Sequence, residues 1–205
     1  MAVTIEQLDF ENAAAKLNCE VAAIKAVYDV ESAGGGFLSD NDTPKILFEG
    51  HVFWRQLKDK QVNPEQYVSG NENVLYKSWT RKYYKGGFGE YDRLKKAIEI
   101  VPKSHPLRNV FEECAVRSCS WGAFQIMAFH AEKLGYQDAI DFMYTIAGNE
   151  KMQLQIFIDF VTAFDLVKYL RSKNWAAFAR GFNGPAYAVN RYDQKMAAAY
   201  NKFSK

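Results

Sequence analysis

The chain has 205 residues and a formal net charge of +2 at pH 7, and 48% of its residues are hydrophobic while 24% are charged. This balance is typical of a globular domain and argues against a chain that is disordered throughout. The weak positive charge does not indicate a nucleic-acid partner, and no apolar run approaches the ~20 residues that span a bilayer. We expect a single domain over residues 1–205, with no nucleic-acid binding and no stable membrane insertion.

Apolar residues repeat with helical spacing along most of the chain, which predicts a mainly α-helical fold. Thr4 and Asn18 are the expected N-caps of the first two helices, because such side chains accept hydrogen bonds from free backbone amides. The glycine-rich run 33–36 is expected to end the second helix. The helical segments expected are residues 5–17, 19–32, 51–58, 91–101, a segment that begins at Pro106, and residues 121–134, 138–147, 149–164, 174–182 and 190–203.

Two stretches depart from this periodicity. Residues 37–50 predict a small extended or β segment, because Lys45–Phe48 is short and apolar and follows turn-forming residues. Residues 60–90 form an irregular, aromatic-rich insertion, which is typical of a binding loop or a small lobe. Its rings, together with the one that follows it, either stack on sugars or pack together: Tyr67, Tyr76, Trp79, Tyr83, Tyr84, Phe88 and Tyr91.

The cysteines and histidines do not form a metal-binding pattern. Cys19, Cys114 and Cys119 are odd in number and lack the paired spacing of a zinc site, so we expect three small buried side chains. The three histidines lie far apart, at positions 51, 105 and 130. The sequence also lacks a phosphate-binding or dinucleotide-binding glycine motif. We therefore expect neither a metal nor a cofactor.

Glu31 stands out because it occupies the apolar face of its own helix. It follows Ile24 by seven residues, Val27 by four and Tyr28 by three, and these spacings place all four on one stripe. A carboxyl on such a face loses hydration, which raises its pKa and keeps it protonated closer to neutral pH. Glu31 is therefore a candidate general acid. The alternative interpretation is a glutamate at the helix end that forms a salt bridge or turns to solvent.

Glu49 is the second candidate carboxylate. It ends the apolar run Ile46–Phe48 and directly precedes Gly50 and His51. Cleavage of a glycosidic bond needs two carboxyl groups, one that protonates the leaving oxygen and one that stabilises the cation, attacks it or activates water. A residue that caps the following helix is the alternative for Glu49.

Two further segments combine aromatic and amide side chains. Within residues 118–127, Trp121 and Gln125 are four positions apart, which would place them on one helix face as a sugar-stacking ring and an amide. Further along the chain, the turn 183–185 presents Asn183 beside several tyrosines. Each segment is a candidate ligand-binding wall, and each is also consistent with a buried core or a well-satisfied loop.

Together, these segments resemble the N-acetylmuramidase family of phage endolysins, a lysozyme-like group of enzymes. The motifs that carry the resemblance are Val30-Glu31-Ser32 with Gly36-Phe37, Lys45-Ile-Leu-Phe-Glu49 with His51, Ser120-Trp-Gly-Ala-Phe-Gln-Ile-Met127, and Phe178-Ala-Arg followed by Asn183-Gly-Pro, Tyr187, Asn190 and Tyr192-Asp193. The resemblance covers residues 4–203, so we expect one catalytic domain without a separate cell-wall-binding domain.

The resemblance implies a lysozyme-like fold and hydrolysis of the β-1,4 bond between N-acetylmuramic acid and N-acetylglucosamine in peptidoglycan. It implies that Glu31 is the catalytic acid and that Glu49 is the second carboxylate. It also implies a set of substrate-binding side chains: His51, Trp121, Phe124, Gln125, Asn183, Tyr187 and Tyr192. The sequence has Ala33 and Gly50 where members of the family often carry a basic residue.

Two other functions stay open on the sequence alone. A lytic transglycosylase uses one acid/base glutamate and forms 1,6-anhydro products, and a non-catalytic peptidoglycan-binding phage protein would use the aromatic rings without cleaving the glycan. We expect a monomer. No signal peptide is recognisable, so we also expect the protein to accumulate in the host cytoplasm. It would then reach the cell wall in the periplasm after another protein permeabilises the membrane.

Overall fold

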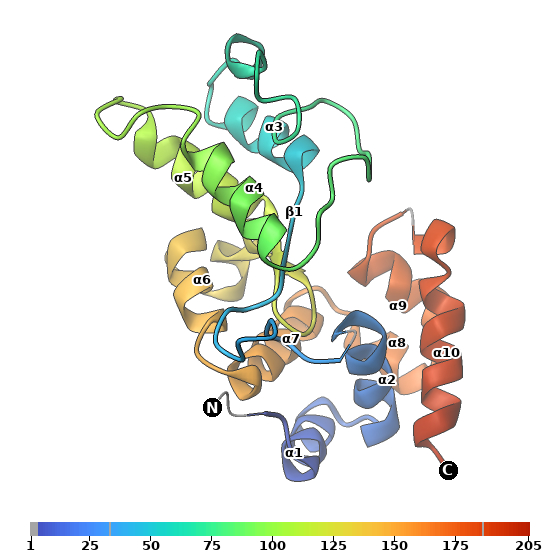
Figure 1. Cartoon of the computed structure of the whole chain (residues 1–205). Coiled ribbons are helices and arrows are strands. Elements are labelled where there is room, and N and C mark those ends of the chain that lie inside the picture. Colours follow the sequence, from blue (N-terminus) through green and yellow to red (C-terminus); the bar gives the residue numbers. More distant parts are fainter. Residues whose placement is uncertain (1–3, 33, 186) are drawn as a thin grey trace. The chain divides into compact units, whose positions relative to one another are not determined.

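The computed structural model describes residues 4–32, 34–185 and 187–205, and it confirms the expected mainly α-helical fold (Figure 1). The chain divides into two compact units. Unit 1 contains residues 1–37, 122–124 and 148–205, and unit 2 contains residues 38–121 and 125–147. Ala33, at the expected end of the second helix, lies outside the described residues. None of the helices in the described part of the chain has the length and apolarity needed to cross a membrane.

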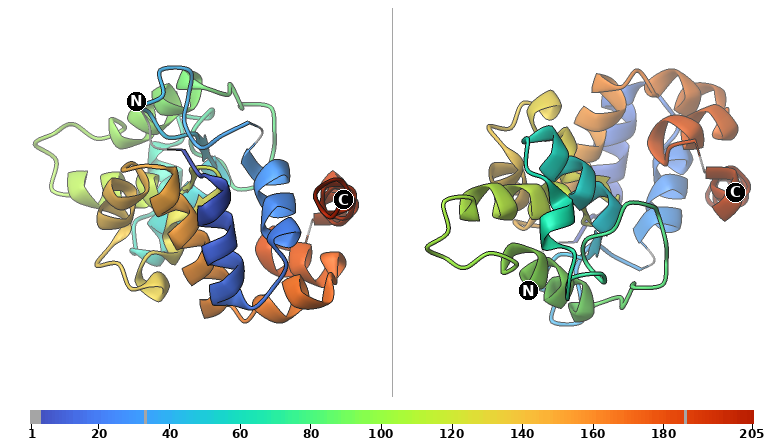
Figure 2. Two further views of the ribbon diagram at one scale, coloured as in Figure 1. Left: turned by 90° about the horizontal axis from the view of Figure 1, so that it is seen from below. Right: turned by 90° about the horizontal axis from the view of Figure 1, so that it is seen from above.

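Unit 1 is built on the helix that carries Glu31. Its elements are α1 (Gln7–Leu17), α2 (Val21–Ser32), α7 (Glu150–Ala163), α8 (Val167–Ser172), α9 (Trp175–Phe182), the 3-10 helix η4 (Tyr187–Asn190) and α10 (Tyr192–Phe203). α10 lies along α2, and α1 packs against both α2 and α7 (Figure 1, Figure 2). Ile24 and Val27 of α2 are fully buried. The helix is therefore stabilised by neighbours that cover its apolar face, rather than by helix propensity alone.

Unit 2 combines a small sheet with helices. Its elements are β1 (Ile46–Phe48), α3 (Gly50–Asp59), η1 (Pro64–Tyr67), α4 (Phe88–Ile98), α5 (Arg108–Arg117), β2 (Cys119–Trp121), β3 (Ile126–Met127), η2 (Ala128–His130), η3 (Glu132–Leu134) and α6 (Ala139–Ile146). The strands are antiparallel in the order β1-β2-β3, and Leu47 pairs with Ser120. α4 packs against β1 and α5, and α3 packs against α5 (Figure 1). β1 confirms the extended segment predicted within residues 37–50.

Residues 121–134 do not form the predicted helix. They contain the end of β2, the strand β3 and two short 3-10 helices instead. Gly122 has a φ of +70° and Gln125 has a φ of +49°, and these left-handed positions turn the chain into a hairpin. The apolar spacing that indicated a helix comes from two buried strands and the turn that joins them.

The predicted N-caps of the first two helices are also wrong. α1 begins after Glu6, whose backbone N–H donates to Asp9 Oδ2 at 2.8 Å. Asn18 is the C-cap of α1 rather than the N-cap of α2, and its φ of 47° is left-handed. Asparagine tolerates this conformation better than most residues, so the same side chain suits either end of a helix.

Candidate active site

Glu31 lies in the last turn of α2, on the helix that buries Ile24 and Val27. The residue keeps partial exposure to solvent. Its Oε1 accepts a hydrogen bond of 2.8 Å from Asn183 Nδ2. Asn183 is the C-cap of α9, so the packing of unit 1 brings the two side chains together across 152 positions of sequence. The apolar stripe expected around Glu31 is present, and the carboxyl at its end has an oriented amide partner.

Burial raises the pKa of Glu31 from 4.5 to about 7. The direction follows because desolvation penalises the charged form of a carboxyl. Two weaker effects lower the pKa, namely the hydrogen bond from Asn183 and the positive charge of Lys195 on α10. Glu31 therefore retains its proton on a large fraction of molecules near neutral pH, which is the state that a general acid needs.

The other polar atom of the Asn183 amide, its oxygen Oδ1, is buried and lacks a hydrogen-bond partner among the residues that the structure describes. Tyr187 stands at the start of η4 and lines a cavity of about 590 Å³ in unit 1, whose lining does not include Glu31. Tyr192 is the first residue of α10. The structure thus joins Asn183 to Glu31, whereas Tyr187 lines a pocket that Glu31 does not line.

Polar side chains of α7 fix the chain that follows Glu31, and sequence reasoning missed them. Glu150 Oε1 accepts a hydrogen bond of 2.5 Å from the backbone N–H of Gly36, and Glu150 Oε2 accepts one of 3.3 Å from Tyr28 Oη. Gln153 Oε1 accepts one of 2.7 Å from the backbone N–H of Ala123. Both side chains are buried, so they satisfy backbone donors that water does not reach.

Glu49 occupies the N-cap position of α3, but its side chain does not cap that helix. Its Oε1 accepts a hydrogen bond of 2.5 Å from Tyr84 Oη, and its Oε2 lies 3.3 Å from His51 Nδ1. The second approach lacks hydrogen-bond geometry, and within the described chain both of these buried atoms are without a hydrogen-bond partner. The Glu49 side chain is 13% exposed. The structure therefore excludes the capping interpretation and shows that Tyr84 and His51 surround this carboxylate.

Trp121 and Phe124 lie in the cores of their units, and each is 1% exposed. Trp121, on β2, donates its Nε1–H to Val116 O at 3.4 Å and packs edge-on against Tyr91. Phe124 stacks on Phe157 with ring centroids 4.4 Å apart. Rings buried to this extent have no face free to stack on a sugar, so the expected direct contact with substrate is corrected to a role in packing.

Gln125 lies in the turn between β2 and β3 and does not share a helix face with Trp121. Its Oε1 accepts a hydrogen bond of 2.8 Å from Ser120 Oγ. Because the turn places Gln125 in a left-handed conformation, its side chain leaves the hairpin in a direction that helical spacing did not predict. Its partial exposure keeps it available as a candidate substrate ligand.

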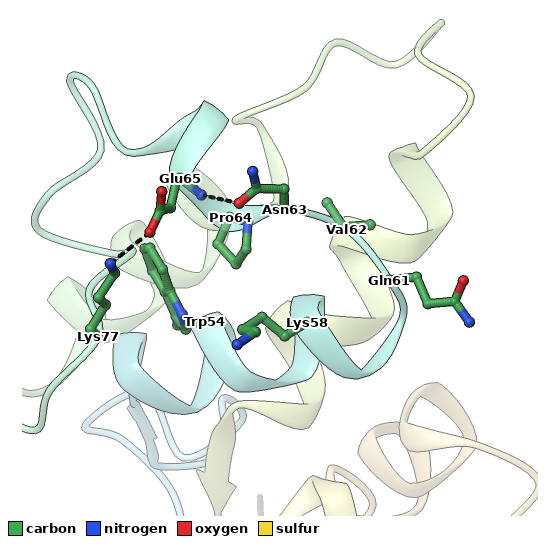
Figure 3. A pocket seen from close by; sticks show the side chains of 8 residues that line it. All are labelled: Trp54, Lys58, Gln61, Val62, Asn63, Pro64, Glu65 and Lys77. Atoms are coloured by element: carbon green, nitrogen blue, oxygen red, sulfur yellow. Dashed lines mark hydrogen bonds and ion pairs between the residues drawn. The ribbon is translucent and has the colours of Figure 1, made fainter.

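Unit 2 has a surface pocket that the sequence did not predict (Figure 3). Its volume is about 630 Å³, and its lining residues are Trp54, Lys58, Gln61, Val62, Asn63, Pro64, Glu65 and Lys77. Trp54 and Lys58 project into it from α3, and Lys77 pairs with Glu65 at 2.6 Å. None of the predicted site residues lines this pocket.

Metal-binding side chains do not cluster in residues 4–32, 34–185 and 187–205, where no three His, Cys, Asp or Glu residues are placed to hold an ion. The three cysteines are free, with Cys114 and Cys119 buried and Cys19 partly exposed. Burial raises the pKa of Cys114 to about 12 and that of Cys19 to about 11. The prediction of buried thiols is thus correct for two of the three.

A shielded glutamic acid at the end of one helix and a second glutamate before another, in a mainly α fold, are features of lysozyme-type glycoside hydrolases. The comparisons agree. The sequence profile of the N-acetylmuramidase family matches residues 20–204. Among solved structures, the crystal structure of the Burkholderia AP3 phage endolysin matches with a TM-score of 0.80 and 38% identity, covering 98% of this chain and 71% of that one. The comparison with curated proteins gives no match.

The chain belongs to the N-acetylmuramidase family. It is a peptidoglycan hydrolase, a glycoside hydrolase of lysozyme type.

Proposed function

We propose that this protein cleaves the β-1,4 bond between N-acetylmuramic acid and N-acetylglucosamine, with Glu31 as the general acid and Glu49 as the second carboxylate. In the overall reaction, the glycosidic C–O bond breaks, the leaving oxygen takes a proton, and the anomeric carbon gains a hydroxyl group from water. Two carboxyl groups, one as the acid and one as the second carboxylate, supply what this chemistry requires.

The observation that carries the proposal is the shielded position of the Glu31 carboxyl at the end of α2, where Asn183 is its hydrogen-bond partner. Its pKa of about 7 arises from burial, and Asn183 orients it through a hydrogen bond to Oε1. With Oε1 acting as an acceptor, Oε2 is left to carry the transferable proton. Substrate binding that removed further water would favour the protonated form still more.

The surroundings of Glu49 suit the role of the second carboxylate. Its Oε1 accepts a hydrogen bond from Tyr84, and its Oε2 faces His51. A donor aimed at a carboxylate oxygen stabilises the ionised form, which is the form that attacks an anomeric carbon, activates water or stabilises a cation. His51 is a candidate to orient Glu49 rather than to bind sugar alone.

We also propose where the protein accumulates and acts. The similarity to a phage endolysin supports a protein that accumulates in the host cytoplasm and reaches the cell wall once the membrane is permeabilised. A monomer is part of the same proposal.

The test compares Glu31→Gln, Glu49→Gln and a control, Glu112→Gln, on purified peptidoglycan. Glu112 is exposed on α5 and makes no hydrogen bond or ion pair with any described residue. We expect both site variants to lose at least about a hundredfold in the release of reducing ends, and the control to retain wild-type activity. All three should keep the wild-type circular dichroism spectrum. Full activity of Glu31→Gln would refute the assignment of the acid, and mass spectra dominated by 1,6-anhydro ends would identify a transglycosylase instead.

A further inference from the structure

A buried ion pair lies directly behind the strand that leads to Glu49. Glu90 and Arg93, one turn apart on α4, are 0% and 1% exposed at their side chains, and Arg93 Nη1 lies 2.7 Å from Glu90 Oε2. A buried pair of this kind is weak evidence for stability, because desolvation of the two charges offsets much of their attraction. The groups that hydrogen-bond to Glu90 and Arg93 therefore indicate the role of the pair.

The pair holds the backbone on both sides of Glu49. Phe48, the last residue of β1, donates its N–H to Glu90 Oε2 at 3.2 Å and accepts a hydrogen bond of 2.7 Å from Arg93 Nη1 at its carbonyl. Arg93 Nη2 also donates to Tyr76 Oη at 3.3 Å, and the same hydroxyl accepts the N–H of Gly50 at 3.2 Å. The residues before and after Glu49 are thus tied to one guanidinium, directly or through a single tyrosine.

The pair also holds the segment that reaches the Glu49 side chain. Glu90 Oε1 accepts the backbone N–H of Lys85 at 2.6 Å and that of Gly86 at 3.0 Å. These residues directly follow Tyr84, whose hydroxyl donates to Glu49 Oε1, and the guanidinium of Arg93 lies 5.8 Å from the centre of the Tyr84 ring.

Tyr76 adds a contact on the other side of the carboxylate. Its ring stacks on His51 with centroids 6.4 Å apart. A Cβ atom at Gly50 would lie 2.3 Å from the Tyr76 ring, so only glycine permits this approach. Two tyrosines of the aromatic insertion therefore surround Glu49 rather than forming an exposed platform for sugars.

We propose that the buried Glu90–Arg93 pair is a positioning device for Glu49, and that Tyr84 is the side chain through which it fixes the carboxylate. The inference rests on the proposed role of Glu49. Because Glu90 anchors both the backbone at Phe48 and the segment after Tyr84, the donor and the acceptor of the Tyr84–Glu49 hydrogen bond share one support. Preorganised donors of this kind cost no rearrangement when the reaction occurs.

The ionisable groups around Glu49 are consistent with Tyr84 acting as a permanent donor. They are His51 on α3, Tyr76 and Tyr84 in the insertion, Cys119 on β2 and, behind the tyrosines, Arg93 on α4. Burial, followed by the hydrogen bond to Glu49, raises the pKa of Tyr84 well above 10. Tyr84 therefore keeps its proton at neutral pH and stays a donor to Glu49.

The experiment measures kcat and KM of Tyr84→Phe on soluble peptidoglycan fragments, with Tyr83→Phe as the matched control. The hydrogen bonds of the described residues include none between Tyr83 and Glu49. A hydrogen bond to a charged group supports a decrease in kcat of about ten- to a hundredfold for Tyr84→Phe. KM and the control should stay at wild-type values.

A second variant, Arg93→Lys, keeps the charge but loses the forked donors to Phe48 and Tyr76. We expect the same decrease in kcat at an unchanged KM. If Arg93→Lys does not fold, Tyr84→Phe decides alone. A kcat of Tyr84→Phe equal to that of the control overturns the positioning role, even where Glu49→Gln is inactive. Full activity of Glu49→Gln would instead remove the proposed function of Glu49, so the two failures are distinguishable.

Discussion

Replacing Glu31 by glutamine should stabilise the protein in alkaline solution and leave its stability in acid unchanged. The folded-state pKa of about 7 lies above the ordinary value of 4.5, so the folded chain holds a proton that the unfolded chain has released over this interval. Stability then falls as pH rises from about 4.5 to about 7 and is constant above it. At about 1.4 kcal/mol per pKa unit, the loss reaches about 3 kcal/mol.

Glutamine is neutral and nearly isosteric, and its amide oxygen can still accept the hydrogen bond from Asn183, so the variant escapes this loss. Urea denaturation of wild type and Glu31→Gln at pH 4.5 and pH 8 measures the difference directly. We expect a gap of up to about 3 kcal/mol at pH 8 that closes at pH 4.5. Glu112→Gln serves as the control and should follow the wild type. An equal gap at both pH values would refute the reasoning, because it would show that Glu31 is not kept protonated by burial.

Two further changes probe unit 1. Asn183→Ala removes a hydrogen bond that lowers the pKa of Glu31. The alkaline limb of the pH–rate profile should therefore move to higher pH, and the plateau rate should fall about tenfold. An unchanged alkaline limb would contradict a role of this hydrogen bond in setting the pKa. Gly36→Ala places a Cβ 1.9 Å from Gln153 Oε1 and 2.9 Å from the backbone nitrogen of Ala123. Thermal denaturation should therefore show a decrease of about 1–3 kcal/mol in the free energy of unfolding. A variant as stable as wild type would show that the Gln153 side chain on α7 moves aside without cost.

The sequence was most informative where periodicity extended over several turns. The stripe of Ile24 and Val27 predicted α2, and the same spacing identified Glu31 before any packing was known. The hairpin was missed for the converse reason. β2 and β3 contain three and two residues, which is too short for a period-2 pattern, and the left-handed Gln125 has no signal in its residue type.

The environment of Glu49 could not be derived from the sequence because its partners are distant along the chain. Tyr84 is 35 positions away, and nothing in the aromatic insertion distinguishes it from Tyr83 beside it. Glu90 and Arg93 have the three-residue spacing of an ordinary surface ion pair on a helix, so their complete burial is visible only once α4 is packed against β1. Sequence spacing thus identifies candidate carboxyl groups, whereas the fold selects the groups that tune them.

Unit 1 draws on both early and late parts of the chain, since α2 lies within residues 1–37 while α7, α9 and α10 lie within residues 148–205. On the ribosome, α2 emerges long before the helix that will lie along it, and Asn183 is translated 152 residues after Glu31. The nascent chain therefore presents Glu31 to water as an ordinary acidic side chain. The burial that raises its pKa is complete only when translation has passed α10, so a truncated product that ends before residue 148 lacks the helices that shield this side chain.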